Sequence, residues 1–322
     1  MVDRRYARQG PLHPLLGVLE SKETMVMTLK ALFREYMRSA DFKRLKGTTQ
    51  KKYEQQLAYA LKTRVGRKHL AQHTLDEIKA STMNIAYEQW VETGVYNANY
   101  RKAAFSAAWK YGMRRDYMVH NPCSLIRGVT SKPRRVRWTR EQVRKFLDTA
   151  YSDFQYRSIG LIVHMAYDWG QRVGDMRLMT WDKLDLETCR LDLTQSKRNA
   201  EVHLPINKGL CKMLREQKQD FEFQEYVAPR IKPRAGAYTP YEVDEISKLI
   251  NAVLSKANLP LELTAMDLRR TAITEMLEGG VDMFGIMQVS GHVNPQSVKP
   301  YMVNTFSGAS KALAARGNND DE

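Results

Sequence analysis

The stretch Gly170-Gln171-Arg172-Val173-Gly174-Asp175 opens a segment whose next apolar residues are Met176, Leu178 and Trp181. This spacing predicts an amphipathic helix with Arg172 at its head. Asp175 follows three residues later, on the same helical face, where the two side chains can pair. Taken alone, the motif is best interpreted as an ordinary surface ion pair, so its meaning depends on the rest of the chain.

Three further segments each place polar residues in a helical or hairpin context. Gln195-Ser196-Lys197 lies at the tip of a predicted hairpin, where Lys197 can reach outward. Asp267-Leu268-Arg269-Arg270-Thr271-Ala272 is predicted to be helical. Ser290-Gly291-His292 is followed by Tyr301, nine residues after the histidine. No other tyrosine lies between His292 and the C-terminus, so no rival nucleophile fits this spacing.

The pattern around these segments predicts a domain of mixed helix and strand at residues 138–305. Thr139 with Gln142 fits a capping box at the start of its first helix. Alternating apolar residues then predict three short strands, and a turn near Arg198-Asn199 would join the last two into a hairpin. The predicted strands are 184–186, 191–193 and 201–206, and the predicted helices after the first are 159–167, 208–218, 241–256, 265–277, 283–289 and 296–303.

The preceding residues predict a compact, all-helical domain at 25–127. Its apolar residues recur at spacings of three and four, and Thr48 is a possible N-cap of the second helix. The Asn121-Pro122 pair marks a stop after the last helix. Around the two domains, the composition predicts three connecting or terminal segments: an N-terminal arm at 1–24, a basic linker at 128–137, and a tail at 306–322 with a helix-prone centre.

The chain has 322 residues and a formal net charge of +15. Residues 1–137 hold 27 basic and 11 acidic side chains, so nearly all the excess positive charge lies in the first part of the chain. A polyanionic partner for that part is the natural inference, because each neutralised phosphate releases condensed counterions. A solvated, solubilising surface is the alternative interpretation.

The composition also excludes several classes of protein. No window approaches about 18 consecutive apolar residues, so we expect no membrane-spanning helix. The first ten residues lack the apolar core of a signal peptide. The three cysteines, Cys123, Cys189 and Cys211, are far apart in the sequence and lack CxxC spacing. We therefore expect neither a disulfide framework nor a zinc site, and a reducing cytoplasm is the simplest location.

Together, the four motifs resemble the tyrosine recombinase family, the phage integrases and their chromosomal relatives. The resemblance covers about residues 138–305 by motif, and the GQRVGD and QSK segments are especially similar to lambda-type integrases. It implies a mainly α fold with a small antiparallel β-sheet, in which a helical core DNA-binding domain precedes an α+β catalytic domain. The helical domain matches the family by pattern alone.

The resemblance also implies a role for five residues. Arg172 and Arg269 would clamp the non-bridging oxygens of the scissile phosphate, for which the planar guanidinium is suited. Tyr301 would be the nucleophile and form a 3′-phosphotyrosyl link. Lys197 would protonate the leaving 5′-oxygen as a general acid. His292 would hydrogen-bond the phosphate or help to move the tyrosine proton. The covalent link conserves the phosphodiester energy, so the resemblance implies no metal and no other cofactor.

Two further positions in these motifs bear on the implied chemistry. Asp175 would orient Arg172 from behind. Met266 stands where the family usually has a histidine, three residues before Arg269. A thioether cannot donate a hydrogen bond, and losing one such group typically costs about 10²–10³ in rate. Thr264 or a water could substitute, turnover could be slow, or Met266 could simply be a core residue.

Basic residues near the linker and the second arginine box are further candidates for DNA contacts. Arg270 is a second candidate for the contact with the phosphate. The family motif selects Arg269, so we expect Arg270 to have a structural role or to make a backbone contact. The candidate DNA-binding residues are Lys132, Arg134, Arg135, Arg137 and Arg270.

The function implied by the resemblance is site-specific DNA recombination. Four protomers would join two double-stranded DNA sites and pass through a Holliday junction, with a DNA-bending protein as a possible accessory partner and no membrane involved. Two alternatives remain open. One is a catalytically weak or inactive DNA-binding homologue, suggested by Met266, and the other is an enzyme similar to type IB topoisomerases, which share this chemistry.

Overall fold

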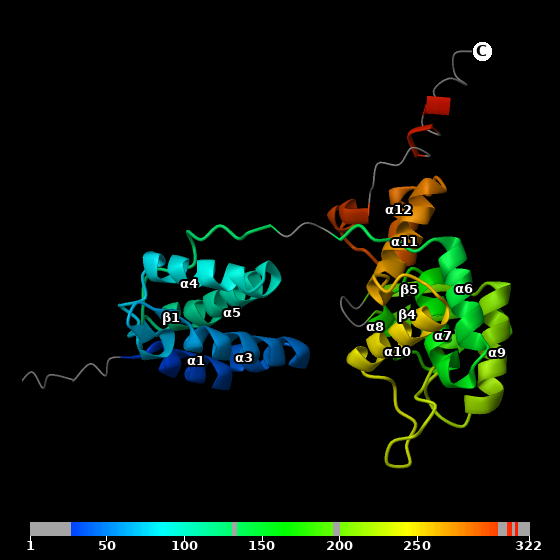
Figure 1. Cartoon of the computed structure of the whole chain (residues 1–322), viewed down its shortest axis with the longest axis horizontal. Helices are drawn as coiled ribbons and strands as arrows, with labels where there is room; N and C mark the ends of the chain where they lie inside the picture. The colour runs from blue at the N-terminus through cyan, green and yellow to red at the C-terminus, as the bar shows by residue number, and fades with distance from the viewer. Residues whose placement is uncertain (1–26, 131–133, 196–199, 302–307, 311–312, 315–322) are drawn as a thin grey trace, which may run out of the picture. The chain divides into compact units, whose positions relative to one another are not determined.

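The computed structural model describes residues 27–130, 134–195, 200–301, 308–310 and 313–314. The chain divides into two compact units, Met1–Pro133 and Arg134–Glu322, and the division falls inside the predicted linker (Figure 1). Each unit has a hydrophobic core of its own. Among the described residues, no helix combines the length and the apolar character needed to cross a lipid bilayer. The predicted arm at 1–24 lies outside the described residues.

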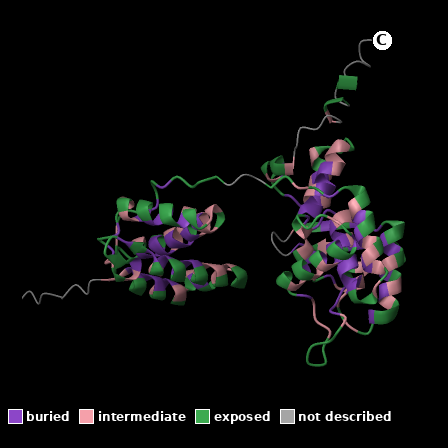
Figure 2. Ribbon diagram, in the orientation of Figure 1, coloured by how far each residue is buried: buried purple, intermediate pink, exposed green. Residues whose placement is uncertain are grey.

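The first unit is helical, with one short two-stranded antiparallel ribbon. Its buried residues gather along the last helix, α5, whose small side chains Ala98, Ala104 and Ala108 let neighbouring helices approach closely (Figure 2). The elements of this unit are α1 Leu29–Arg38, α2 Ala40–Lys43, α3 Gly47–Lys62, β1 Arg64–Val65, β2 Lys68–His69, η1 Leu70–Gln72, α4 Ala80–Glu92 and α5 Val95–Met113.

The predicted N-cap at Thr48 is wrong, because α3 begins at Gly47 with Lys46 as its cap residue. The Lys46 carbonyl accepts the backbone N–H of Gln50. The side-chain amide of Gln50 then donates to the carbonyls of Lys43 and Leu45. These bonds tie the start of the helix to the preceding turn without a capping hydroxyl.

The second unit packs helices around α7, whose buried residues lie on nearly all its faces, as expected for a central helix (Figure 2). Its elements are α6 Arg140–Tyr151, α7 Phe154–Asp168, α8 Val173–Met176, η2 Trp181–Lys183, β3 Leu184–Asp185, β4 Arg190–Thr194, β5 Glu201–Pro205, α9 Lys208–Phe221, α10 Val243–Lys256, α11 Ala265–Glu278, α12 Met283–Ser290, η3 Pro295–Ser297 and η4 Lys299–Tyr301. The chain is therefore mainly helical with a small antiparallel sheet, as the fold prediction states.

The sheet of this unit is antiparallel, in the order β3-β4-β5. Leu191 pairs with Leu204, and both are buried. In β5, residues alternate between buried and exposed, as a strand with one face on the core requires. The hairpin turn predicted near Arg198-Asn199 lies outside the described residues.

In the second unit, the first helix begins where the local signal predicts, whereas the last predicted helix is interrupted. The Thr139–Gln142 capping box is confirmed, with both reciprocal hydrogen bonds present. The continuous helix predicted at 296–303 is wrong over its described part, which contains η3 and η4 instead. Pro300 explains the break, because it has no N–H to donate and disfavours helical backbone at the preceding residue.

The end of the predicted linker packs against α11. The Arg134 guanidinium forms an ion pair with Asp267, with Nε 3.0 Å from Oδ1, and it also bonds the carbonyl of Glu262. The backbone N–H of Trp138 donates to Thr271 Oγ1 over 3.0 Å. From Arg134 onward, the chain is therefore part of the second unit and not a free tether.

Two cysteines that are far apart in the sequence meet beside the sheet. The Sγ atoms of Cys189 and Cys211 lie 3.0 Å apart, and both residues are free thiols. Burial is the main reason that the pKa of Cys211 is raised, and its contact with Cys189 acts in the same direction.

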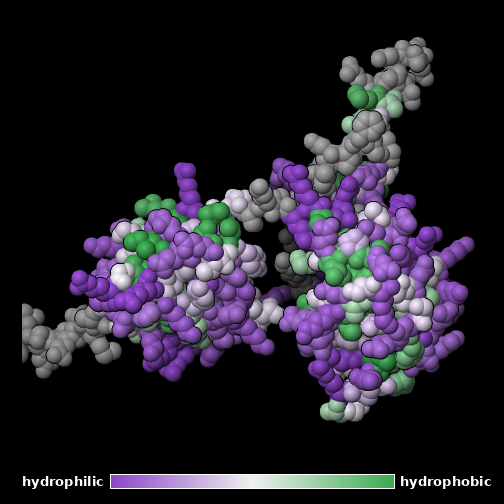
Figure 3. Space-filling model, viewed as in Figure 1, coloured by the Kyte–Doolittle hydropathy of each residue, from purple (hydrophilic) through white to green (hydrophobic). Residues whose placement is uncertain are grey.

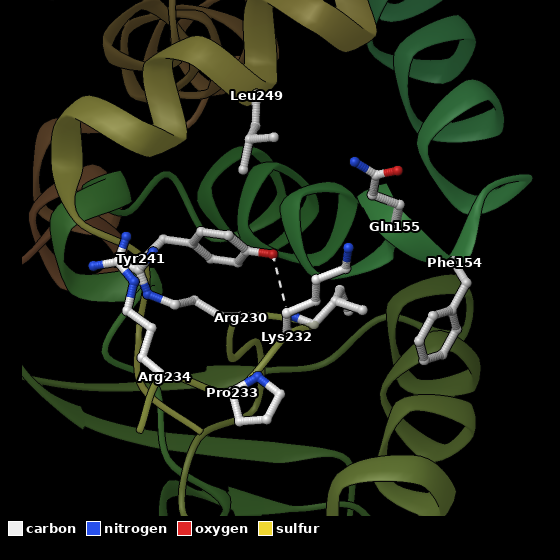
Figure 4. A pocket seen from close by; sticks show the side chains of 9 residues that line it. Phe154, Gln155, Arg230, Lys232, Pro233, Arg234, Tyr241 and Leu249 are labelled. Atoms are coloured by element: carbon white, nitrogen blue, oxygen red, sulfur yellow. Dashed lines mark hydrogen bonds between the residues drawn. The ribbon is translucent and has the colours of Figure 1, made fainter. Parts of the chain in front are cut away.

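The long connection between α9 and α10 is held by one carboxylate. Glu245 on α10 pairs with Arg230 and Arg234. These two arginines line a cavity of about 400 Å³ together with Tyr241 and Leu249 (Figure 4). The hydrogen bond from Arg230 is the main cause that lowers the pKa of Glu245 to about 2. Glu245 thus holds both guanidinium groups by direct ion pairs, and its single charge offsets one of their two charges.

Replacing Glu245 is expected to remove a pH-dependent contribution to stability. Because the folded-state pKa is depressed, the ion pairs stabilise the fold above the ordinary carboxyl pKa, and this stability is lost as pH falls toward 2. Glu245→Gln should lower the free energy of unfolding at pH 7 by about 1 kcal/mol, since solvent partly screens the pair. Denaturant titrations should show this difference shrinking between pH 5 and pH 3; a constant difference would contradict the assignment.

Candidate active site

Four of the five predicted catalytic residues come together in the second unit. Arg172 is the N-cap residue of α8, Arg269 lies on α11, His292 follows the end of α12, and Tyr301 ends η4. Arg172, Arg269 and Tyr301 line one cavity of about 360 Å³. The ring centres of Tyr301 and His292 are 5.7 Å apart. Lys197, the fifth residue, lies outside the described residues.

Arg269 is the most deeply buried cation of the site, with 5% of its surface exposed. Its Nη1 donates to the carbonyl of Gly170 over 3.0 Å, and its Nη2 donates to the carbonyl of Ser290 over 2.7 Å. Burial lowers the pKa of Arg269, the charge of Arg172 lowers it further, and Tyr301 acts in the opposite direction. These two acceptors are neutral, so they hold the guanidinium without cancelling its charge.

His292 is buried between Arg269 and Ser290. Its Nε2 lies 3.2 Å from Arg269 Nη2, and its Nδ1 lies 2.7 Å from Ser290 Oγ. A guanidinium can only donate, so Nε2 accepts and the ring proton of the neutral imidazole lies on Nδ1. This assignment follows from the partners, which fix the orientation of the His292 ring.

Arg172 is partly exposed and has two partners on the protein side. Its Nη1 donates to Gln195 Oε1 over 2.9 Å and lies 3.8 Å from Asp175 Oδ2. The Asp175 side chain is 3% exposed, so the carboxylate approaches Arg172 from within the fold. This position agrees with the predicted orienting role of Asp175, which stays a prediction.

The segment that carries Tyr301 is tied down by its neighbours on α11. Arg270 Nη1 donates to the carbonyl of Pro300 over 3.1 Å, and its guanidinium lies 5.7 Å from the ring centre of Tyr301. Thr274 Oγ1 donates to the Tyr301 carbonyl over 3.4 Å. Arg270 therefore has a structural contact in this arrangement, in line with the alternative considered for it.

The interpretation of Met266 as a core residue is wrong. Met266 is 86% exposed and lines the same cavity as Arg172 and Arg269. The hydroxyl of Thr264, considered as a substitute for the missing histidine, donates to Asp267 Oδ2 over 2.7 Å as part of a capping box. Its proton is thus already used in starting α11.

The predicted DNA-binding residues near the linker have different surroundings. The Arg134 guanidinium is committed to Asp267, and Arg137 Nη1 pairs with Glu278 Oε1 over 3.0 Å. Both contacts lie within the second unit and explain these residues without DNA. Arg135 is exposed, and Lys132 lies outside the described residues.

Two glutamines lie at the centre of the site, although the sequence motifs indicate no role for them. Gln171 and Gln195 are 1% and 0% exposed, and the Nε2 of Gln195 donates to the Oε1 of Gln171 over 2.6 Å. Both stand inside the quoted motifs, next to candidate catalytic residues. The sequence could therefore indicate these two glutamines only through their position within a motif, because a glutamine side chain is uncharged.

The cavity is lined by charged, polar and apolar side chains together, Val173, Ile246 and Met266 among the apolar ones. The visible faces of both units are largely hydrophilic (Figure 3). Within the described part of the chain, no group of three or more His, Cys, Asp or Glu side chains is arranged to hold a metal ion.

Two solved integrase structures have a fold similar to that of this chain. A lambda integrase fragment, solved as a dimer bound to a COC′ core site, has a TM-score of 0.71 and 18% identity and covers 85% of this chain and 95% of that chain. The Tn1549 transposon integrase, solved with a circular intermediate DNA, has a TM-score of 0.70 and 17% identity, and covers 90% of this chain and 99% of that chain. At this identity, the likeness shows the fold.

Sequence comparison identifies the family. Tyrosine recombinase XerC of Anoxybacillus flavithermus is 25% identical over 149 residues, which are 44% of this chain and 48% of the relative. The chain thus spans about half the length of the curated relative that it matches. The model of the phage integrase family matches residues 137–307, more than half of the chain. The chain therefore belongs to the phage integrase family.

Proposed function

We propose that this chain is a site-specific DNA recombinase that breaks and rejoins DNA strands through Tyr301. The observation that carries the proposal is the convergence of Arg172, Arg269 and Tyr301 on one cavity. His292 lies against Arg269 and Tyr301, so four separate segments of the sequence meet at the site. A phosphodiester is the substrate that such a set fits, because two fixed cations face a phenol that can act as nucleophile.

In the proposed reaction, the Tyr301 hydroxyl gives up its proton to water, with the help of His292, while its oxygen attacks the scissile phosphorus and the bond to the 5′-oxygen breaks. The products are a 3′-phosphotyrosyl link and a free 5′-hydroxyl, which receives its proton from Lys197. Attack by a second 5′-hydroxyl reverses the step and releases Tyr301. Bonds and protons balance, and the energy of the diester is conserved, so the proposal requires no cofactor.

The two arginines would stabilise the charge that phosphoryl transfer places on the non-bridging oxygens. Arg269 suits this role because neutral carbonyls hold it and its charge remains available. Its Nε is also a buried donor without a partner among the described residues. A phosphate oxygen in the cavity could supply an acceptor, which would offset the cost of leaving that donor unpaired.

His292 would hydrogen-bond the phosphate or take part in moving the Tyr301 proton. Its ring lies beside that of Tyr301, and its Nε2 already accepts from Arg269. Asp175, 3.8 Å from Arg172, would limit the directions in which that guanidinium can turn.

The active assembly would be a homotetramer on two double-stranded DNA recombination sites, acting in the cytoplasm with a Holliday junction as intermediate. The support is a structural relative, lambda integrase, solved as a tetramer bound to a Holliday junction, with a TM-score of 0.67 and 17% identity over 89% of this chain and 78% of that chain. A DNA-bending accessory protein is part of the proposal as a possible partner. A monomer that relaxes plasmids without a specific site would favour the topoisomerase alternative.

Tyr301→Phe should abolish covalent attachment to DNA while leaving DNA binding intact, because only the nucleophilic oxygen is removed. In a substrate nicked near the cleavage site, cleavage releases a short fragment that carries the free 5′-hydroxyl. Once this fragment has dissociated, the strand cannot be rejoined, and a denaturing gel detects the trapped adduct. The control is Tyr238→Phe, whose ring packs against Phe221 and Phe223; it should keep the adduct. An adduct that persists in Tyr301→Phe would refute the assignment.

Met266 favours the alternative of a catalytically weak DNA-binding homologue, and its exposure offers a test. Met266→His should raise the single-turnover rate of adduct formation by about 10-fold or more, because an imidazole can donate or shuttle a proton at the cavity. Met266→Leu, of similar size, should leave the rate unchanged. Equal rates in all three proteins would show that this position takes no part in the reaction.

DNA affinity should fall steeply with salt, by about 0.9 log units per log unit of salt for each phosphate neutralised. The first unit carries most of the excess positive charge, so a protein limited to residues 134–322 should show a much flatter dependence. Binding titrations at several salt concentrations measure both slopes. An unchanged slope would mean that the first unit is not the main contact with the duplex.

A further inference from the structure

The catalytic arginines are connected by a buried amide that the proposed mechanism does not use. We propose that Gln195 is a positioning residue that fixes Arg172 for the scissile phosphate and couples it to Arg269. The inference rests on the proposed function and adds to it a residue that acts through Arg172, without contact to DNA.

Gln195 joins three segments of the site through its side chain alone. Its Oε1 accepts from Arg172 Nη1 over 2.9 Å. Its Nε2 donates to Gln171 Oε1 over 2.6 Å and to the carbonyl of Ser290 over 2.8 Å. The residue is completely buried. Both the oxygen and the nitrogen of the amide thus form hydrogen bonds, and these short distances leave the side chain little freedom to rotate.

The orientation of this amide is dictated by its partners. Gln171 Nε2 donates to the carbonyls of Trp169 over 3.0 Å and Val289 over 2.6 Å, so its oxygen must face Gln195. Gln195 then has to turn its Nε2 toward Gln171 and its oxygen toward Arg172. A flipped amide would set donor against donor at Arg172, because a guanidinium has no acceptor.

The same amide links the two arginines. The carbonyl of Ser290 accepts from Gln195 Nε2 and from Arg269 Nη2, at 2.8 and 2.7 Å. A path of hydrogen bonds therefore runs from Arg172 through Gln195 and Ser290 to Arg269. Displacing Gln195 would disturb both guanidinium groups at once.

Gly291 provides the space that this arrangement needs. A Cβ at Gly291 would lie 2.6 Å from Gln195 Nε2, and the residue has a φ of +66°, a conformation that side chains with a Cβ rarely adopt. The glycine before His292 thus allows Gln195 to reach the Ser290 carbonyl. Gly291 and Gln195 fit together as two parts of one contact.

A neutral acceptor has a specific advantage for an arginine that must bind an anion. A carboxylate at hydrogen-bond distance would hold Arg172 equally well but would cancel its charge. Asp175 lies further away, at 3.8 Å, so the direct hydrogen bond comes from an amide. The guanidinium is therefore oriented while most of its charge remains for the phosphate.

The test compares Gln195→Met with wild type on two substrates. Each is a nicked DNA that traps the Tyr301 adduct, one with a normal scissile phosphodiester and one with a methylphosphonate, in which a neutral methyl replaces a charged non-bridging oxygen. We expect Gln195→Met to slow single-turnover adduct formation by about 10- to 100-fold on the phosphodiester. On the methylphosphonate it should match wild type closely, because there is little charge for Arg172 to stabilise.

Gln217 supplies a matched control. It is also 0% exposed, and its side chain bonds Arg157, Ser158 and the carbonyl of Val227, away from the site. Gln217→Met should change the rates on both substrates by the same factor, since a loss of folded protein does not depend on the substrate. An equal loss on both substrates in Gln195→Met would overturn the proposal, because it would indicate a purely structural role.

Gln195→Glu provides a second test if Gln195→Met does not fold. The carboxyl group keeps an acceptor for Arg172, but once ionised it loses its donor and pairs with Arg172 in competition with the phosphate. The rate should therefore fall with rising pH relative to wild type, and parallel pH profiles would overturn the proposal. A wild-type protein without an adduct overturns the proposed function and this inference together. An active wild type matched by Gln195→Met overturns this inference alone.

Discussion

A buried positive charge, the guanidinium of Arg269, organises the second unit around its cavity. Burying a cation is costly unless hydrogen bonds replace its water. Here the replacements are the backbone carbonyls of Gly170 and Ser290, which belong to the turn before α8 and the end of α12. Both turns must therefore meet α11, and their meeting brings Arg172 and His292 to the same place. The geometry of the site follows from the need to satisfy this one side chain.

The acceptors in this network are mostly neutral, which suits a site that handles a phosphate. Carbonyl and amide oxygens orient Arg269 and Arg172 without neutralising them. At a second cavity of this unit, by contrast, the lining residues Arg230 and Arg234 are both in direct contact with a carboxylate, that of Glu245 (Figure 4 shows the two arginines). Fixed cations held mainly by neutral acceptors form a preorganised environment for developing negative charge. The two cavities thus differ in how closely a carboxylate approaches their arginines: Glu245 is in direct contact with both of its partners, whereas Asp175 lies 3.8 Å from Arg172.

Local signals in the sequence predicted the helices and strands well, and contacts between distant segments account for what they missed. The capping box of Thr139 needs only Gln142, three residues away, so it can be recognised from the sequence. Arg134 resembles a linker cation because its partner, Asp267, is 133 residues further along. Pro300 was a readable signal against a continuous C-terminal helix, since a proline inside a helix removes a donor.

In the candidate site too, the sequence did not indicate the features that depend on contacts between distant segments. Spacing and residue type indicated the charged residues, and the structure brings together Arg172, Arg269, His292 and Tyr301. Gln195 was part of a quoted motif but had no assigned role, because its importance arises from burial and from three partners on two distant segments. The exposure of Met266 was equally invisible, since an apolar residue in a helix is expected to face the core.

The most direct measurement of the central claim is peptide mapping by mass spectrometry of the protein trapped on a nicked duplex. The account predicts a single modified peptide in which the Tyr301 oxygen carries the 3′-phosphate of the cleaved strand. Attachment at another residue, or through a 5′-phosphate, would contradict it. So would the absence of any covalent product under conditions in which the duplex is fully bound.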